Sequence, residues 1–438
     1  MKVNVRLAAA VAALAFAATA AAQSNDKRAA RQGPLAGVPG AAGPHVEKIK
    51  GLGDNEWLNL GPPAPDPKWG HARGRSWSCK MPYAPDLRGA FLNGQGVHGY
   101  IKPDGYFMDD IFFYDLLAHR WICIYPGTDT KGFVENIKKG DLKVNEDGQL
   151  VDREGRPVPF SAIPGHSYQL HTYDSDLRKY VFANGPGIGG EQHVRNDPWC
   201  KDGTGLLREQ GKADRVNGTP YFFNVPKGEF ERFPLGGPAM QGTGAGGVLF
   251  YLPSKRALWL YGTGVTQVAD TATRRWVDTR AKGPTPKGID FGACTDLKRD
   301  RIYVAGGSYR APWGKDEGYV FTYDVATNTW TNLPNKGKPP EVFASNYACV
   351  HYDSAADRVI VVLFAAAKNA RGVYVYGPDT ASWDDAPFPL PAGFLESQCG
   401  HGFYSPELNA HFFFGARDSD DKGNVWVYRY RRAGPRGR

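Results

Sequence analysis

The sequence predicts an all-β protein, a closed ring of six four-stranded sheets known as a β-propeller, and three observations lead to this prediction. A polar turn of five or six residues followed by an apolar or aromatic run occurs six times. A second unit, an aromatic strand, a turn and in most copies a Trp strand, lies between successive copies. The later copies start 44, 57 and 52 residues apart, and a period of about 40–50 residues is typical of a four-stranded propeller blade. The six copies start at Tyr83, Tyr173, Tyr251, Thr295, Tyr352 and Tyr404.

The composition agrees with a protein rich in turns and strands. The 438 residues include 54 Gly, 33 Pro and only 4 Met, and 13% are aromatic. Strands favour aromatic side chains, and turns favour Gly and Pro. A chain of this length holds two or three domains or one large all-β domain, and the repeats favour the single domain.

Residues 1–22 have the pattern of a secretory signal peptide. Two basic residues precede an apolar stretch, residues 7–18, that is too short to span a bilayer, and three Ala residues precede Gln23. No other segment is long and apolar enough to cross a membrane. We therefore expect a secreted or periplasmic protein without a membrane span.

The domain organisation follows from the repeats. Residues 23–54, rich in Ala, Gly and Pro, are predicted to form a disordered linker, residues 55–432 the propeller, and residues 433–438 a basic tail. The last copy lacks a Trp strand, and residues 56–62 are similar to the Trp strand of the fourth copy. We therefore expect strand 56–62 to complete the last blade and close the ring. The blades are predicted at about residues 75–127, 163–237, 241–284, 288–334, 343–387 and 398–431.

The charge is concentrated at the two ends of the chain. The formal net charge is +8, of which residues 1–31 contribute +4 and residues 429–438 contribute +5. The remainder, 8 − 4 − 5, gives −1 for the globular body. Because a nucleic-acid interface needs a basic face on the folded body, a nucleic-acid partner is not expected.

The six cysteines show no zinc-type spacing. Cys294, Cys349 and Cys399 occupy equivalent first strands of three successive repeats, so we expect small buried side chains near the axis. Cys200 lies in a long loop and is the preferred candidate for a disulfide, which an exported protein can form.

The fourth repeat resembles the kelch repeat. The matching features are Ala305-Gly306-Gly307 after a second strand, the Tyr323-Asp324 pair, Trp330 six residues beyond Asp324, and Pro334. The resemblance covers about residues 56–431 and is weaker in the other repeats. It implies a kelch-type propeller of the superfamily that includes the central domain of galactose oxidase.

The copper-radical chemistry of galactose oxidase is not expected here. That site requires an adjacent Tyr-His pair and a His from a further C-terminal domain, and the sequence has no Tyr-His dipeptide. No cofactor is predicted on this basis, although a divalent metal is compatible with the histidines described below.

The predicted insertions share one face. Adjacent strands of a blade are antiparallel, so the loops from second to third strands and from fourth strands to the next blade lie on the same side. Residues 128–165 and 184–219 are the largest insertions there, and smaller ones lie at 93–110, 306–319 and 416–424. We name this side the long-loop face and the opposite side the short-turn face. Because long loops on a rigid scaffold often bind ligands, we expect the long-loop face to be the working face.

A histidine cluster is predicted on the long-loop face. The topology brings together blades six, one and two, with His98, His166, His193 and His401, as metal-ligand candidates. His166, His193 and His401 are also the catalytic candidates, with Asp109, Glu191, Glu396 and Gln398 in the same sector. The alternative is that these histidines are only solvated or hydrogen-bonded.

A mixed polar rim is the other predicted site. A shallow funnel with such a rim suits a sugar or an acidic peptide, and the alternative is an ordinary polar surface. The candidate binding residues are Arg75, His98, Gln241, Asp290, Arg310, Asn346 and Gln398, with Arg371 in an equivalent loop. Tyr106, Tyr309 and Trp313 are candidates for stacking on sugar rings.

Two functional hypotheses follow. The first is an exported, monomeric binding module that recognises a carbohydrate or an extracytoplasmic protein through the long-loop face. The alternative is a polysaccharide-active, lyase-like enzyme with a His-based and metal-assisted site on that face, an idea drawn from fold analogy.

Overall fold

The structure, a computed structural model, describes most of the repeat region. The described residues are 33–75, 78, 80–94, 102–146, 149–159, 167–183, 220–231, 247–262, 264–270, 275–288, 291–306, 318–340, 348–364, 371–394, 400–416 and 422–432.

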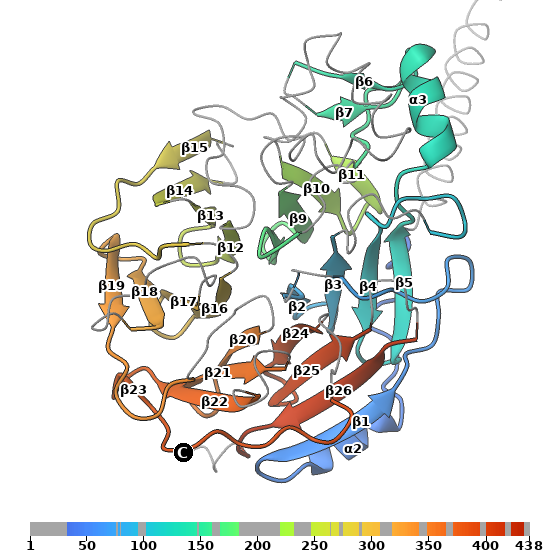
Figure 1. The fold of residues 1–438 in the computed structure, drawn as a ribbon. Coiled ribbons are helices and arrows are strands. Elements are labelled where there is room, and N and C mark those ends of the chain that lie inside the picture. The colour runs from blue at the N-terminus through green and yellow to red at the C-terminus, as the bar shows by residue number, and fades with distance from the viewer. Residues whose placement is uncertain are drawn as a thin grey trace, which may run out of the picture.

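Six four-stranded antiparallel sheets surround a central axis, which confirms the predicted six-bladed propeller (Figure 1). The first sheet consists of β2 (Tyr83–Ala84), β3 (Gly89–Asn93), β4 (Ile111–Asp115) and β5 (Arg120–Tyr125). The second consists of β8 (His171–Asp174), β9 (Lys179–Ala183), β10 (Pro220–Asn224) and β11 (Glu229–Glu231). The third consists of β12 (Val248–Leu252), β13 (Ala257–Gly262), β14 (Val265–Asp270) and β15 (Arg275–Asp278).

The remaining three sheets follow the same order from the axis outward. The fourth consists of β16 (Gly292–Asp296), β17 (Arg301–Ala305), β18 (Val320–Asp324) and β19 (Thr329–Leu333). The fifth consists of β20 (Ala348–Asp353), β21 (Arg358–Leu363), β22 (Gly372–Gly377) and β23 (Ser382–Trp383). The sixth combines β24 (Gly400–Ser405), β25 (Ala410–Gly415) and β26 (Asn424–Arg429) with β1 (Glu56–Gly61).

The sixth sheet contains both ends of the repeat region. The strand β1 pairs antiparallel with β26, with Trp57 opposite Tyr428 and Asn59 opposite Trp426. The Trp57 ring lies 4.6 Å from Phe394 and 4.5 Å from Tyr428 between ring centroids. The pairing predicted for residues 56–62 is therefore present, and aromatic contacts hold it in place.

The repeated Asp of the turns explains why the first two strands of a sheet connect so tightly. The Asp174 side chain accepts hydrogen bonds from the backbone N–H groups of Asp176 and Leu177, at 3.0 and 2.9 Å. Asp353 does the same for Ala355 and Ala356, at 3.0 and 2.9 Å. A short polar side chain that bonds to its own turn favours this conformation over a continued strand.

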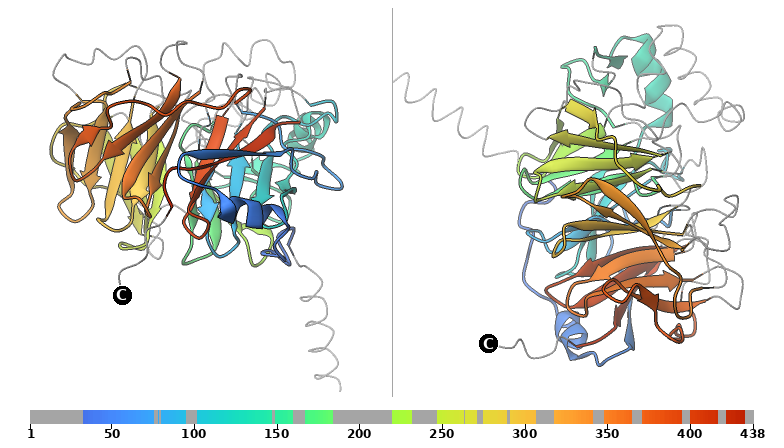
Figure 2. Two further views of the ribbon diagram at one scale, coloured as in Figure 1. Left: turned by 90° about the horizontal axis from the view of Figure 1, so that it is seen from below. Right: turned by 90° about the vertical axis from the view of Figure 1, so that its left-hand side faces the viewer.

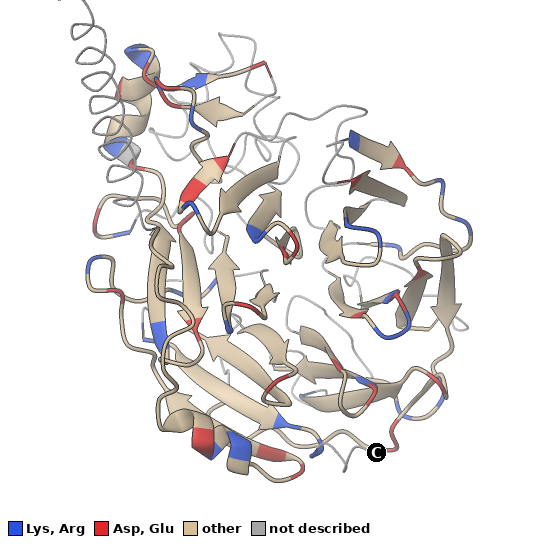
Figure 3. Cartoon of the chain, turned by 180° about the vertical axis from the view of Figure 1, so that it is seen from behind, with Lys and Arg blue, Asp and Glu red and all other residues tan. Residues whose placement is uncertain are grey.

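Most strands are buried on both faces because the sheets stack against each other around the ring. Between the third and fourth sheets, the ring centroids of Trp259 and Trp330 lie 5.9 Å apart. Trp330 Nε1 donates to Thr266 Oγ1 at 3.0 Å. All residues of β12 and β20 are buried. This double burial is the reason that the apolar runs of the sequence are continuous and do not alternate. Charged residues lie mostly in the turns (Figure 3).

The predicted disordered linker is wrong for residues 33–54. These residues include α2 (His45–Gly51), whose Val46 and Ile49 are buried against the propeller. Arg429 of β26 donates to the backbone carbonyls of Lys50 and Leu52, at 3.0 and 2.5 Å. In both views of Figure 2, α2 lies beside the sixth sheet. A few apolar residues at helical spacing order the segment despite its linker-like composition.

The insertion after the first sheet also carries secondary structure. It contains α3 (Thr130–Lys138) and a pair of short strands, β6 (Lys143–Val144) and β7 (Leu150–Val151). The side chain of Asp129 caps α3 by accepting from the N–H of Lys131 at 3.0 Å. The insertion itself was predicted at residues 128–165, whereas α3 was not predicted. Neither of the helices in the described ranges is long and apolar enough to cross a membrane.

Candidate functional site

A cavity of about 320 Å³ lies on the propeller axis, and all six sheets contribute to its wall. We name it the axial pocket. Residues from the innermost strand of each sheet, or from the segment leading into it, form the wall. The residues that begin the six sequence repeats all line it: Tyr83, Tyr173, Tyr251, Thr295, Tyr352 and Tyr404.

The axial pocket belongs to the short-turn face. The turns that follow the innermost strands also line it, through Pro85, Ser175, Pro253, Leu297, Ser354 and Pro406. Sequence reasoning chose the opposite face because it used loop length as its signal. The repeat itself could have predicted this pocket, because equivalent positions of the six repeats converge on the axis of the ring.

The tyrosines of the ring connect neighbouring sheets. The hydroxyl of Tyr173 donates to Asp86 at 3.0 Å, and that of Tyr404 donates to Asp353 at 3.1 Å. The Tyr83 hydroxyl donates to Glu407 at 2.7 Å, which joins the first sheet to the sixth. In each case the acceptor carboxylate lies on the preceding sheet of the ring. These bonds hold the turns around the pocket in fixed positions.

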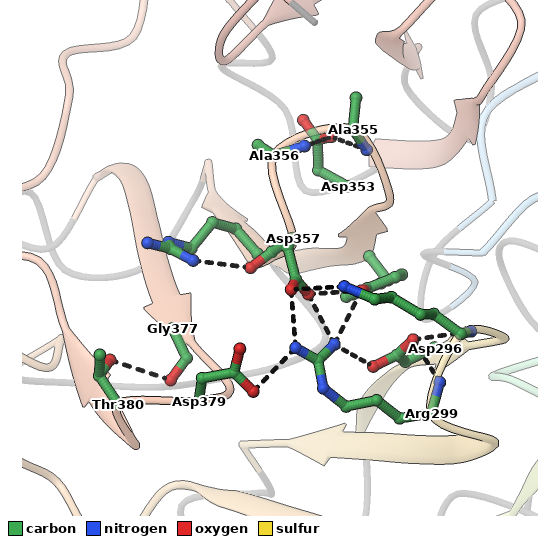
Figure 4. Close-up of polar contacts among 12 residues, drawn as sticks. Asp296, Arg299, Asp353, Ala355, Ala356, Asp357, Gly377, Asp379 and Thr380 are labelled. Carbon is green, nitrogen blue, oxygen red and sulfur yellow. Dashed lines mark hydrogen bonds and ion pairs between the residues drawn. The ribbon is translucent and has the colours of Figure 1, made fainter. Parts of the chain in front are cut away.

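One Arg stabilises the rim between the fourth and fifth sheets (Figure 4). The Arg299 guanidinium forms a bidentate pair with Asp357, at 2.6 and 2.7 Å. It also donates to Asp296 and Asp379, each at 2.8 Å. The hydrogen bonds that Asp357 accepts from Arg299 are the main reason that the pKa of the Asp357 carboxyl lies well below its ordinary value. Bidentate, charge-assisted pairing of this kind is stronger than an ordinary surface ion pair.

We expect Arg299→Ala to lower the free energy of unfolding by about 2–3 kcal/mol, because three carboxylates then lose their common cation. Arg299→Lys is expected to recover only part of the loss, since an ammonium cannot reproduce the bidentate geometry. The exposed pair of Arg156 and Asp152 offers a control, and Arg156→Ala should change stability by less than about 0.5 kcal/mol. Urea unfolding measures all three variants. An Arg299→Ala protein as stable as Arg156→Ala would contradict the role given to Arg299.

Two lysines, Lys80 and Lys298, line the axial pocket, and Lys80 is the one whose amine contacts the third sheet. Lys80 Nζ donates to the backbone carbonyl of Leu249 at 2.6 Å and lies 3.7 Å from the centroid of the Phe250 ring. Burial lowers the pKa of Lys80 well below its ordinary value. Burial also raises the pKa of the Cys294 thiol, so this thiol is neutral. Cys294 and Cys349 are buried, in agreement with their predicted role as small buried residues.

A chain of three polar side chains leads from the pocket into the protein. The ring of His351 lines the pocket, and its Nδ1 lies 3.2 Å from Nδ1 of His411. His411 Nε2 in turn lies 3.2 Å from the Asp353 carboxylate. Burial, followed by the neighbouring His411, lowers the pKa of His351 well below its ordinary value. Protonation of His351 is therefore disfavoured in the folded protein.

The prediction that Arg75 lies on a binding rim is wrong. Its side chain is fully buried and pairs with Asp110, and Lys102 Nζ lies 3.0 Å from the same carboxylate. The backbone N–H of Arg75 donates to His401 Nε2 at 2.9 Å. Arg75 therefore forms an ion pair with Asp110 inside the protein.

His401 does not have a free nitrogen for a metal or for proton transfer. Its Nε2 accepts from Arg75, and its Nδ1 donates to the Ser78 carbonyl. Burial lowers the pKa of His401 to about 3, which keeps the ring neutral. The alternative of a hydrogen-bonded histidine is therefore the one that the structure supports for this residue.

Three further predicted residues are described, and each has an internal contact. Asp109 is buried and accepts from the backbone and the hydroxyl of Thr128 at 2.7 and 2.6 Å. Arg371 donates to the carbonyl of Phe394 at 2.8 Å. The Tyr106 ring lies 5.5 Å from that of Trp69.

The other site candidates lie outside the described residues, so they stay predictions. They are His98, His166, His193, Gln241, Asp290, Arg310, Asn346 and Gln398, with Glu191, Glu396, Tyr309 and Trp313. Within the described part of the chain, no three His, Cys, Asp or Glu side chains converge on a point that could hold a metal. His98, His166 and His193 lie outside that part of the chain, so the divalent metal also stays a prediction.

Comparison with known proteins adds a family. A family profile described as the Kelch motif matches residues 293–337, which contain the fourth sheet. The protein is a six-bladed β-propeller whose fourth sheet carries a Kelch motif. A curated relative, the Rab9 effector protein with kelch motifs from Bos taurus, is 27% identical over 99 residues. The match includes 20% of this chain and 27% of the relative, so it spans about a quarter of the relative's length.

Two solved structures are similar to this chain at low TM-scores. A chain of the crystal structure of the mitotic checkpoint complex has a TM-score of 0.43 at 9% identity, covering 87% of this chain and 93% of that one. An oligogalacturonate lyase in complex with manganese has a TM-score of 0.38 at 12% identity, covering 86% and 98%. At these values neither likeness adds to the family assignment.

Proposed function

We propose that this kelch propeller is an exported binding module whose short-turn face engages a protein partner. The observation that carries the proposal is the axial pocket, which equivalent positions of all six sheets surround. Turns with hydrogen-bonded tyrosines and the Arg299 network give this face a rigid rim. A rigid concave surface with an apolar centre and a polar rim is typical of recognition sites.

Exposed apolar side chains at the rim support this face. Among the described residues, three large hydrophobic side chains are notably exposed: Leu177 at 37%, Val277 at 57% and Leu297 at 63%. Leu177 and Leu297 both lie in turns that follow innermost strands, and Leu297 lines the pocket. Val277 lies in β15, an outermost strand. Apolar side chains at the edge of a pocket are the kind that a protein partner covers.

The named function of the relative also supports a protein partner. The matched Bos taurus protein is named as an effector, a protein that acts by engaging another protein. Because the match covers about a quarter of that relative, only the class of partner is transferred to this chain, and the identity of the partner is not.

A peptide selection tests the proposal. A displayed library of random peptides is selected on the purified protein, and the binding of enriched peptides is measured by fluorescence anisotropy. We expect Leu297→Asp to weaken this binding by roughly tenfold or more, because a charge at the rim must be desolvated, and Val277→Asp to leave it unchanged. Failure to enrich any peptide, or equal effects of the two variants, would overturn the proposal.

A carbohydrate array and a set of acidic polysaccharides form the second arm of the same test. Carbohydrate binding that persists in Leu297→Asp would favour the long-loop face, and release of unsaturated products, read by absorbance, would favour the lyase-like alternative. Loss of turnover in His166→Ala or His193→Ala would assign the chemistry to those residues.

Export is a separate part of the proposal. We expect the protein from an expressing bacterium to start at Gln23 and to be recovered outside the cytoplasm, as mass spectrometry of the purified chain would show. Leu14→Arg interrupts the apolar stretch and should retain the full-length chain in the cytoplasm, whereas Lys27→Arg should not. A full-length chain outside the cytoplasm would contradict the predicted cleavage.

A further inference from the structure

Among the described residues, Lys80 is the lysine of the axial pocket for which no carboxylate partner is found. Lys80 precedes β2 in the first sheet, yet its Nζ contacts Leu249 and Phe250 of the third sheet. The side chain therefore reaches from the first sheet to the third. Of the described residues that line the pocket, none is Asp or Glu.

The described contacts of Lys80 use only one of its three N–H donors. A lysine ammonium has three N–H donors, and the Leu249 carbonyl accepts one of them. The Phe250 ring attracts the cation but does not neutralise its charge. Transfer of a charged group from water into a protein costs free energy unless an opposite charge accompanies it. The lowered pKa of Lys80, caused by burial, is the sign of that cost. A bound anion would offset it.

The rest of the wall near Lys80 suits an apolar body. Phe250, Ala293 and Val350 line the pocket there, together with Met81 and the neutral Cys294. The cavity of about 320 Å³ is within the size range of small-molecule sites. A ligand that fits this wall has an apolar or aromatic body and one negative charge.

We propose that the axial pocket binds a small carboxylate with an apolar or aromatic body, and that Lys80 is its counter-ion. This goes beyond the binding of a protein partner, because it requires no partner and uses the interior of the pocket, not its rim. An acidic side chain of a peptide offers the same chemistry, so the experiment includes an arm for each source.

The test compares a charged ligand with its neutral analogue. Phenylacetate and phenylacetamide have the same ring, and each is titrated into the mature protein at millimolar concentrations by NMR. We expect phenylacetate to bind roughly tenfold or more tightly than phenylacetamide, which corresponds to one charge-assisted hydrogen bond. Lys80→Met should abolish this preference. Lys298→Met removes an exposed lysine that also lines the pocket, and it should preserve the preference.

A capped peptide with a single Glu, and its Gln counterpart, form the second arm. Discrimination between the two peptides without any binding of phenylacetate would assign the carboxylate to a protein partner and overturn the small-molecule proposal. Equal binding of phenylacetate and phenylacetamide, or an equal loss in both lysine variants, would also overturn it.

Two features keep the test decisive. Lys80→Gln retains a donor for the Leu249 carbonyl, so it replaces Lys80→Met if circular dichroism shows that the latter is unfolded. The proposed protein-binding function is tested at Leu297, with peptides as ligands, so that either proposal can fail while the other holds.

Discussion

A chain that begins at Pro62 is expected to lose cooperative folding, whereas a chain that begins at Gln23 unfolds as the intact propeller does. The shorter chain lacks β1, which leaves the backbone groups of β26 unpaired at an open sheet edge. It also lacks α2, whose Val46 and Ile49 are buried. Thermal unfolding by circular dichroism measures the difference. Similar melting temperatures for the two chains would contradict the contribution of β1 to the ring.

A single substitution tests the same contact more finely. Trp57 lies against Phe394, Phe413 and Tyr428, with ring centroids 4.6, 5.7 and 4.5 Å away. Because the side chain is only partly buried, we expect Trp57→Ala to lower the free energy of unfolding by about 3 kcal/mol. Val277→Ala, on an exposed outer position, should cost less than about 0.5 kcal/mol.

Acidification from pH 7 to pH 5 is expected to destabilise the folded protein strongly. His171, His351 and His401 are buried, and burial lowers the pKa of each below its ordinary value of 6.5. Between the folded and unfolded pKa values the unfolded chain binds more protons, so stability present above about pH 6.5 is lost as the pH falls. With a folded pKa of about 3, His401 alone costs about 2 kcal/mol at pH 5. The other two histidines act in the same direction.

Urea unfolding at pH 7 and pH 5, at constant ionic strength, measures this effect. His401→Gln removes one titrating group, so its free energy of unfolding should depend less on pH than that of the wild type, even if the variant is less stable overall. An unchanged pH dependence in His401→Gln would show that this histidine does not contribute.

Much of the fold was predictable because the repeat is a local pattern. The Tyr-Asp turn and the Trp strand recur in the sequence, and each corresponds to a particular strand or turn of a sheet. The missing Trp strand of the last copy predicted the place of β1. The segment at residues 33–54 was mispredicted because its composition, averaged over the whole segment, obscured Val46 and Ile49. Nothing in the repeat indicated α3.

The candidate site was less predictable. Loop length pointed to the long-loop face, while the pocket of the described residues lies at the opposite end of the axis. Arg75 and His401 have the chemistry of ligand-binding residues, but their partners are Asp110 and the backbone at residues 75 and 78. The contacts of His401 join segments that are more than 300 residues apart in the sequence, so no local sequence pattern could predict them.

By itself, the sequence determined the all-β class, the number of sheets and the place of the first strand in the last sheet, because periodic apolar runs and turn residues act through neighbours along the chain. Only the tertiary structure decided which polar side chains form hydrogen bonds or ion pairs inside the protein. It also decided that the Lys80 side chain reaches the third sheet. The physical reason is that burial and charge pairing depend on groups brought together by ring closure, at distances along the chain that no repeat encodes.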